Sequence, residues 1–149
     1  PSRRVSAIAI LITLATSGCG GGSGDGGSES SSGSKDTVFE TAYTKCTDGD
    51  FINALSDEPV WKVEEQIPEF FQVADEGKTF IANGVKSDMV GFLGCFLTEF
   101  DTPQAIVAAM DATTSMMGRQ EQSDGDMSYQ WTYHPDNGMN LIVTDASES

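Results

Sequence analysis

The clearest pattern along the chain is a strict alternation of apolar and polar residues in its C-terminal third. The four apolar members of this alternation are Met127, Tyr129, Trp131 and Tyr133. A period of two residues predicts a strand with one buried face. The Pro-Asp-Asn-Gly sequence at 135–138 predicts a turn, and 139–143 predict the returning strand of a hairpin. Residues 119–123, before the turn residues Asp124-Gly125, are expected to add a third strand.

The register of this hairpin can be argued from its apolar positions. A three-residue loop at 136–138 would place Tyr133 opposite Leu141. Trp131 would then face Val143, and one face of the hairpin would be wholly apolar. A two-residue loop would mix the faces, because a slip of one residue moves every side chain to the other side of the sheet. We therefore expect the longer loop, closed by a glycine bulge.

Helical spacing is found in three segments. Residues 37–47 place apolar side chains at intervals of three and four residues, which predicts an amphipathic helix. Residues 87–99 are apolar most of the way round and predict a central helix with Ser87 as its N-cap. A third helix is expected after the Thr-Pro pair at 102–103, with the threonine as N-cap, and it should close at Gly118.

The remaining segments complete the expected fold. Residues 48–68 are expected to be irregular, because Pro59 and Pro68 interrupt any periodicity, with Trp61 anchoring the loop. Residues 69–83 predict a hairpin. The order is then αββααβββ, with about three helices packed on one face of an antiparallel sheet and a C-terminal β-meander. This order defines an α+β domain.

The N-terminal part of the sequence has the features of a targeting signal. Two arginines at 3–4 precede an apolar run at 5–15, and small residues follow, which is the layout of a secretory signal peptide. No apolar run approaches the roughly 18 residues needed to span a bilayer. Residues 1–18 are therefore predicted to be a signal peptide.

The residues that close this segment, Thr16-Ser17-Gly18-Cys19, resemble the lipobox of bacterial lipoproteins. In that family the signal peptidase cuts before the cysteine, whose thiol carries a diacylglyceryl group, and the acyl chains include palmitate. Ser17, Gly18 and Cys19 fit the pattern, whereas Thr16 departs from the aliphatic residue that is usual there. The resemblance implies lipid attachment at Cys19. The alternative is an ordinary signal peptide, with Cys19 incidental and the protein released.

The composition after Cys19 supports an anchor. Residues 20–34 are almost entirely glycine and serine, which is typical of a flexible tether. The expected organisation is a lipidated cysteine and tether at 19–35, then a single α+β domain at 36–149. The expected location is the extracytoplasmic face of the cell membrane, held there by the lipid.

The cysteine count predicts a disulfide. If Cys19 carries lipid, Cys46 and Cys95 remain as an even pair in an exported domain. Closing a loop of this length stabilises a fold by about 4 kcal/mol in the chain-entropy estimate. The alternative is two buried free thiols.

The net charge and the motifs of the chain limit the partners and the kinds of functional site that the sequence predicts. Acidic residues outnumber basic ones by 23 to 8, which gives a net charge of −15 and argues against nucleic acid as a partner. His134 is the only histidine, so a site built from several histidines is excluded. No Gly-x-Ser-x-Gly sequence and no phosphate-binding loop is present. We therefore expect no catalytic, metal or cofactor site. The carboxylates between residues 64 and 76 leave a hydrolase that uses two acids as an alternative.

Two features could serve binding. The aromatic residues Tyr129, Trp131 and Tyr133 could form a recognition surface, or they could be the inner face of the sheet. The six methionines suit either an adaptable surface or a core. The sequences at 110–114, 118–120 and 131–138 resemble a pattern in short secreted bacterial lipoproteins of unknown function.

The function expected from these features is that of a membrane-anchored extracytoplasmic lipoprotein with a small non-catalytic binding or scaffolding domain. Its partner would be a protein or small molecule at the cell envelope. The element order over 87–144 is similar to that of the outer-membrane assembly component BamE and the β-lactamase inhibitor protein. That similarity implies a second alternative, a secreted inhibitor.

Overall fold

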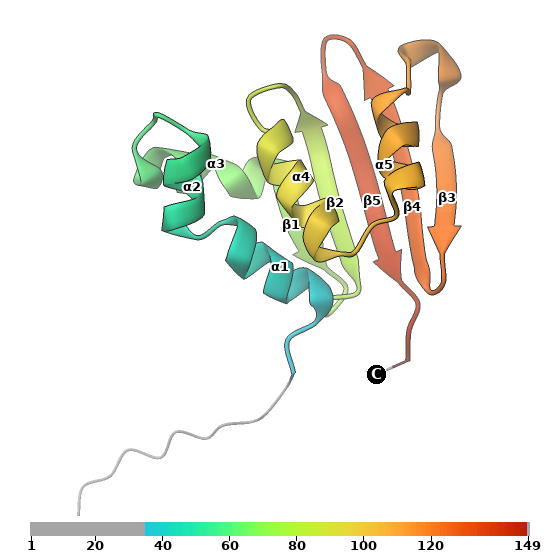
Figure 1. The fold of residues 1–149 in the computed structure, drawn as a ribbon, viewed down its shortest axis with the longest axis horizontal. Coiled ribbons are helices and arrows are strands. Elements are labelled where there is room, and N and C mark those ends of the chain that lie inside the picture. Colours follow the sequence, from blue (N-terminus) through green and yellow to red (C-terminus); the bar gives the residue numbers. More distant parts are fainter. Residues whose placement is uncertain (1–34, 149) are drawn as a thin grey trace, which may run out of the picture. The chain divides into compact units, whose positions relative to one another are not determined.

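The structure is a computed structural model that describes residues 35–148. Its strands form one antiparallel sheet in the order β1-β2-β5-β4-β3 (Figure 1). The strands are β1 (Phe71–Ala74), β2 (Thr79–Val85), β3 (Gln120–Asp124), β4 (Met127–His134) and β5 (Gly138–Asp145). The helices are α1 (Val38–Cys46), α2 (Gly49–Leu55), α3 (Val60–Phe70), α4 (Val90–Glu99) and α5 (Gln104–Asp111), with a 3-10 turn, η1, at Ser115–Met117.

The α+β class and the antiparallel sheet are confirmed, but the expected element order is wrong. Residues 48–68, expected to be irregular, contain α2 and most of α3. The Asp48 side chain caps α2 by accepting a hydrogen bond from the Asp50 amide. Pro59 lies at the N-cap of α3, and Pro68 lies in its last turn, where a proline removes a single backbone hydrogen bond. The prolines therefore bound α3 without preventing it.

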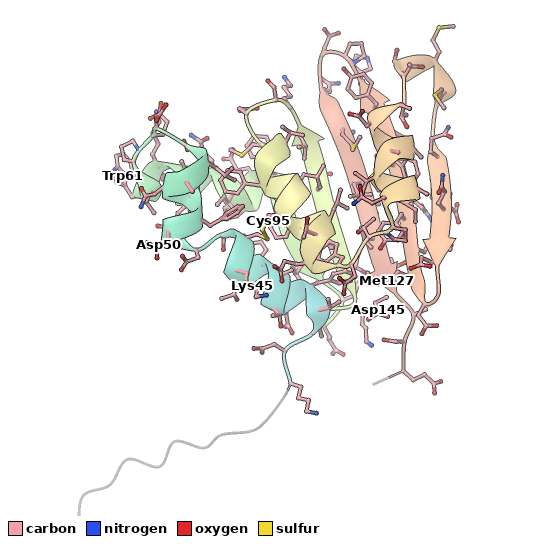
Figure 2. The ribbon with its side chains drawn as sticks, in the orientation of Figure 1. Lys45, Asp50, Trp61, Cys95, Met127 and Asp145 are labelled. Atoms are coloured by element: carbon pink, nitrogen blue, oxygen red, sulfur yellow. A yellow bond between two sulfur atoms is a disulfide. The ribbon has the colours of Figure 1, made fainter. Side chains whose placement is uncertain are left out.

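Trp61 does not anchor this part of the chain. It projects from α3 with 67% of its surface exposed (Figure 2). The helix packs instead through Val63 and Ile67, which are buried at a spacing of four residues.

Two other expected helix boundaries also differ. The helix α4 begins at Val90 after an N-cap, Met89, that makes no side-chain capping bond, so Ser87 is not its cap. The N-cap of α5 is Pro103, and the Thr102 hydroxyl has no hydrogen-bond partner. The helix α5 ends at Asp111, because the chain turns at 112–114 before η1, and Gly118 follows η1 with a φ of 67°.

The hairpin of β4 and β5 forms, but its expected register is wrong by two residues. Trp131 pairs with Leu141 and Tyr133 pairs with Met139, because the loop is 135–137 and Gly138 already belongs to β5. A shift of two residues keeps every side chain on its expected face. Tyr129 and Trp131 therefore lie on the buried face of the sheet.

The core lies between the sheet and α1, α4 and α5, which cover one face of it (Figure 1). Its centre is a group of phenylalanines from α1, β1, β2 and α4, together with Phe100, which directly follows α4. The ring centroids of Phe80 and Phe96 are 4.7 Å apart, and those of Phe39 and Phe100 are 4.8 Å apart. Such pairs add about 0.5–1.5 kcal/mol each beyond the area they bury.

The structure pairs Cys46, the last residue of α1, with Cys95 in the middle of α4 as a disulfide. Their Cα atoms are 5.8 Å apart. The predicted signal peptide and Cys19 lie outside the described residues. None of the helices between residues 35 and 148 is long and apolar enough to cross a membrane.

Candidate ligand-binding cleft

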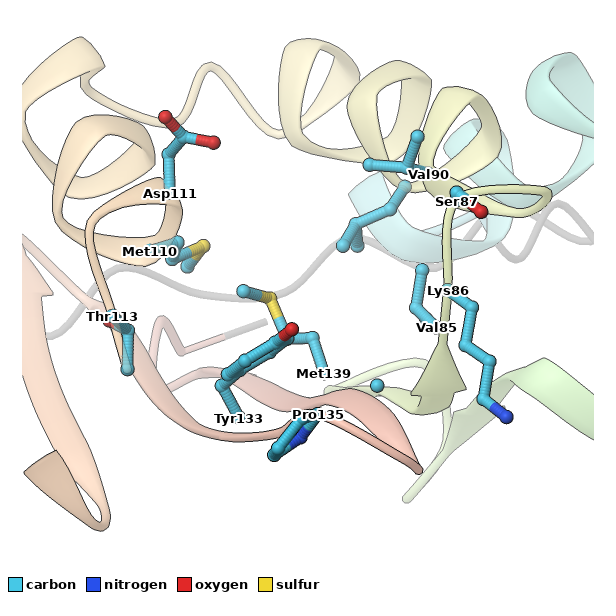
Figure 3. Close-up of a pocket in the computed structure, with 12 residues that line it drawn as sticks. Val85, Lys86, Ser87, Val90, Met110, Asp111, Thr113, Tyr133, Pro135 and Met139 are labelled. Atoms are coloured by element: carbon cyan, nitrogen blue, oxygen red, sulfur yellow. The ribbon is translucent and has the colours of Figure 1, made fainter. Parts of the chain in front are cut away.

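A cleft of about 680 Å³ opens at the end of the sheet where β2 stops and β4 turns into β5. It lies between the N-terminal half of α4 and the C-terminal end of α5 (Figure 3). This volume is within the range of about 300–1,000 Å³ that is usual for small-molecule sites. The cleft is lined by Val85, Lys86, Ser87, Val90, Leu93, Met110, Asp111, Thr113, Tyr133, Pro135, Gly138 and Met139.

The walls of the cleft combine apolar and polar side chains. Figure 3 shows Met110 of α5 and Val90 of α4 on opposite sides of the hollow, with Tyr133 and Met139 of the sheet between them. Val90 is 56% exposed and Tyr133 is 38% exposed. Apolar side chains that stay accessible around a hollow of this size are typical of a binding site.

Polar groups lie at the mouth of the cleft. Lys86 follows β2, and its amino group points away from the hollow in Figure 3. Asp111 is the last residue of α5 and is the only carboxylate among the lining residues. A pair of carboxylates, as used in glycoside hydrolysis, is therefore not brought together in this cleft.

A buried hydrogen bond holds one wall of the cleft in place. The indole nitrogen of Trp131 donates to Oγ1 of Thr113 at 2.8 Å. The same threonine hydroxyl donates to the backbone carbonyl of Ala109 in α5 at 2.6 Å. Thr113 therefore ties the end of α5 to β4, because its one hydroxyl both accepts and donates.

Replacing Thr113 with valine is expected to lower the free energy of unfolding by about 1–3 kcal/mol, because the buried indole N–H of Trp131 loses its partner. Serine keeps the hydroxyl, so Thr113→Ser should cost clearly less. Urea denaturation followed by tryptophan emission tests this, in a Trp61→Phe background that leaves Trp131 as the reporter. Equal losses in the valine and serine variants would contradict the role given to the hydroxyl.

The structure separates the three aromatic residues proposed from the sequence as a recognition surface. Tyr129 is 1% exposed and Trp131 is 2% exposed, so both belong to the core. Burial raises the pKa of the Tyr129 hydroxyl. Tyr133, near the end of the same strand, lines the cleft and is the one of the three that a ligand could contact there.

The other sequence candidates lie in local turns. His134 is exposed, and its Nδ1 accepts a hydrogen bond from the backbone N–H of Asp136 at 3.2 Å. The Asp48 carboxylate caps α2 and so is used within the fold. Among residues 35–148, no three His, Cys, Asp or Glu side chains lie together as metal ligands.

Most of the cleft was not foreseen from the sequence, because its lining comes from segments far apart in the chain. One signal was available. The segment 87–99 has more apolar surface than one buried face needs, and the surplus residue Val90 lies at the cleft.

No protein-family model matches the chain, and comparison with curated proteins and with solved structures found no match. The described part of the chain is an α+β domain with a five-stranded antiparallel sheet and, at one end of that sheet, a cleft lined by apolar and polar side chains.

Proposed function

We propose that this protein is a lipid-anchored extracytoplasmic binding protein whose α+β domain holds an apolar ligand in the cleft. The observation that carries the proposal is the cleft itself, which has the volume of a small-molecule site and keeps Val90 and Tyr133 accessible. The lipobox-like sequence ending at Cys19 and the Gly/Ser-rich segment at 20–34 support the anchor and the tether.

The position of the cleft suits a tethered domain. The chain enters the fold at Thr37, whose side chain packs against Gly77 in the turn between β1 and β2. This turn lies at the end of the sheet opposite the turn between β4 and β5, where the cleft opens (Figure 1). The cleft and the point where the chain enters the fold are therefore at opposite ends of the sheet, so a tether upstream of Thr37 would not cover the mouth of the cleft.

Apolar burial gives this proposal a quantitative expectation. Each buried methylene group contributes about 0.8 kcal/mol, which corresponds to an affinity roughly fourfold tighter for each carbon that the cleft encloses. A homologous series of neutral n-alcohols should therefore bind with rising affinity until the cleft is full, and longer chains should then gain nothing.

The test is a titration of the full chain with hexanol, heptanol and octanol, followed by backbone amide NMR. The Cys19→Ser variant serves as the parent, because it has no thiol to accept a lipid. We expect the largest shifts at Val85, Val90, Met110 and Met139. Shifts spread over the surface, or concentrated away from the cleft, would overturn the proposal.

A matched pair of variants isolates the cleft. Val90→Asn places a polar side chain on its wall and should weaken octanol binding about tenfold, the effect of losing roughly 1.4 kcal/mol of apolar contact. Val38→Asn makes the same exchange on α1, where the valine is 38% exposed and does not line the cleft, and it should leave binding unchanged. Equal losses in both variants would contradict a site in the cleft.

A further inference from the structure

We infer that the ligand of the cleft is a small amphiphile that carries a positive charge, with its apolar part between α4 and α5 and its charged group beside Asp111. This inference rests on the proposed function and adds the chemical class of the ligand. Three features of the described residues support it: the apolar side chains among the lining of the cleft, the small number of large apolar side chains exposed at the cleft itself, and the distribution of charge at its mouth.

The surface around the cleft favours a small molecule over a protein. A stable protein interface buries about 800 Å² on each partner and has an apolar centre. Of the large apolar side chains that are exposed in the described domain, only Val90 and Tyr133 line the cleft. The other apolar lining residues, such as Leu93 and Met110, are almost fully buried. The exposed apolar area at the cleft is therefore small, and little of it is spread over a face that a protein could cover.

The charge at the mouth favours a cation. Asp111 ends α5, and a helix carries partial negative charge at its C-terminus. No basic residue lies in the last turn of α5, and Asp111 takes part in none of the ion pairs found in residues 35–148. The carboxylate and the helix end therefore act together on this side of the cleft. A cationic group could also approach the exposed ring of Tyr133.

The other charged residues near the cleft determine the sign of the electrostatic potential at its mouth. Lys86 is the only basic residue in the lining, and its amino group points away from the hollow (Figure 3). Asp88 precedes α4, and Asp136 lies in the turn after β4 with an exposed carboxylate. With a net charge of −15 on the whole chain, the surrounding field attracts cations and repels anions.

Three probes that share one tail and differ in head charge test the inference. Octyltrimethylammonium, octanol and octyl sulfate are titrated below micelle formation into the full chain carrying Cys19→Ser, at low ionic strength, with amide NMR as the readout. We expect the cation to bind about tenfold tighter than the sulfate, with octanol between them. The preference should shrink as salt is added, since exposed charges are screened over about 8 Å at physiological ionic strength.

Asp111→Asn should remove most of the preference for the cation while leaving octanol binding unchanged. Asp75→Asn removes the same charge from the turn between β1 and β2, at the other end of the sheet, and should keep the preference. Equal loss in the two variants would assign the preference to net charge and overturn the role of Asp111.

The failure of this inference is distinguishable from the failure of the proposed function. Equal binding of all three probes in the cleft would overturn the cationic ligand and leave an apolar site standing. Absence of shifts at Val90, Met110 and Met139 with every probe would overturn both.

Discussion

Replacing Gly138 with alanine is expected to lower the free energy of unfolding by about 3 kcal/mol or more. Gly138 begins β5 with a φ of +83°, a conformation that residues with a Cβ atom rarely adopt. An added Cβ would lie 2.7 Å from the carbonyl carbon of Val85 and would also overlap its oxygen. Both atoms are backbone, so no side-chain rotation can relieve the overlap. Urea denaturation of the parent and the variant measures the loss.

Gly125→Ala is the matched control. Gly125 lies in the turn between β3 and β4 with a φ of +55°, and an added Cβ would meet nothing within 4 Å. This variant should lose only the cost of the left-handed conformation, about 1 kcal/mol. The difference between the two losses in the free energy of unfolding is then the cost of placing a methyl group where β5 lies close to the end of β2. If both variants lost the same free energy of unfolding, the close contact between β5 and β2 would not account for the effect at Gly138.

Gly138→Ala should also disturb the cleft, because Gly138 and Val85 both line it. A protein that folds with the added methyl group must move these two strands apart at the cleft floor. Octanol affinity should therefore fall in Gly138→Ala and stay unchanged in Gly125→Ala.

Breaking the disulfide is expected to have the second large effect. Cys46→Ser or Cys95→Ser should lower the free energy of unfolding by about 2–4 kcal/mol, because the unfolded chain regains the freedom that a cross-link between residues 49 apart removes. Cys46 is fully buried and Cys95 is only partly buried. Cys46→Ser should be the worse variant, since it leaves a hydroxyl in the core.

The measurement is the urea midpoint of the parent with and without reductant. We expect the midpoint to fall on reduction in the parent and not in the Cys46→Ala/Cys95→Ala double variant, which has no bridge to lose. Identical midpoints in the oxidised and reduced parent would show that the pairing contributes nothing to stability.

The sequence predicts much of the sheet, because most of the strands carry a local signal. The alternation from Met127 to Tyr133 identifies β4 and its buried face without any knowledge of what packs there. The predicted register of the hairpin is wrong because the residue type of Gly138 favours a loop position, whereas the structure places it in β5. The position of Gly138 is set by its close contact with the backbone of Val85, more than fifty residues earlier. The residues around Gly138 in the sequence do not predict this contact.

The helix α3 shows a second reason why the sequence alone does not predict the whole fold. Val60, Val63 and Ile67 have helical spacing, but the two prolines at 59 and 68 predict an interrupted segment. Proline is compatible with the N-cap, and in a last turn it costs one hydrogen bond that burial of Val63 and Ile67 can offset. The balance between these terms depends on tertiary packing. The same is true of the cleft, whose walls come from both hairpins and from two helices.

The strand order has a consequence for when this chain can fold. The central strand, β5, is the last of the five to be synthesised, and it pairs with β2, which precedes it by more than fifty residues. Until β5 has left the ribosome, the first hairpin and the β3–β4 hairpin have no strand to join them. Pairing across such a distance is slow to form. A nascent chain in this state cannot complete its sheet, and the edges of the two hairpins that β5 later covers stay unpaired until the last strand is made.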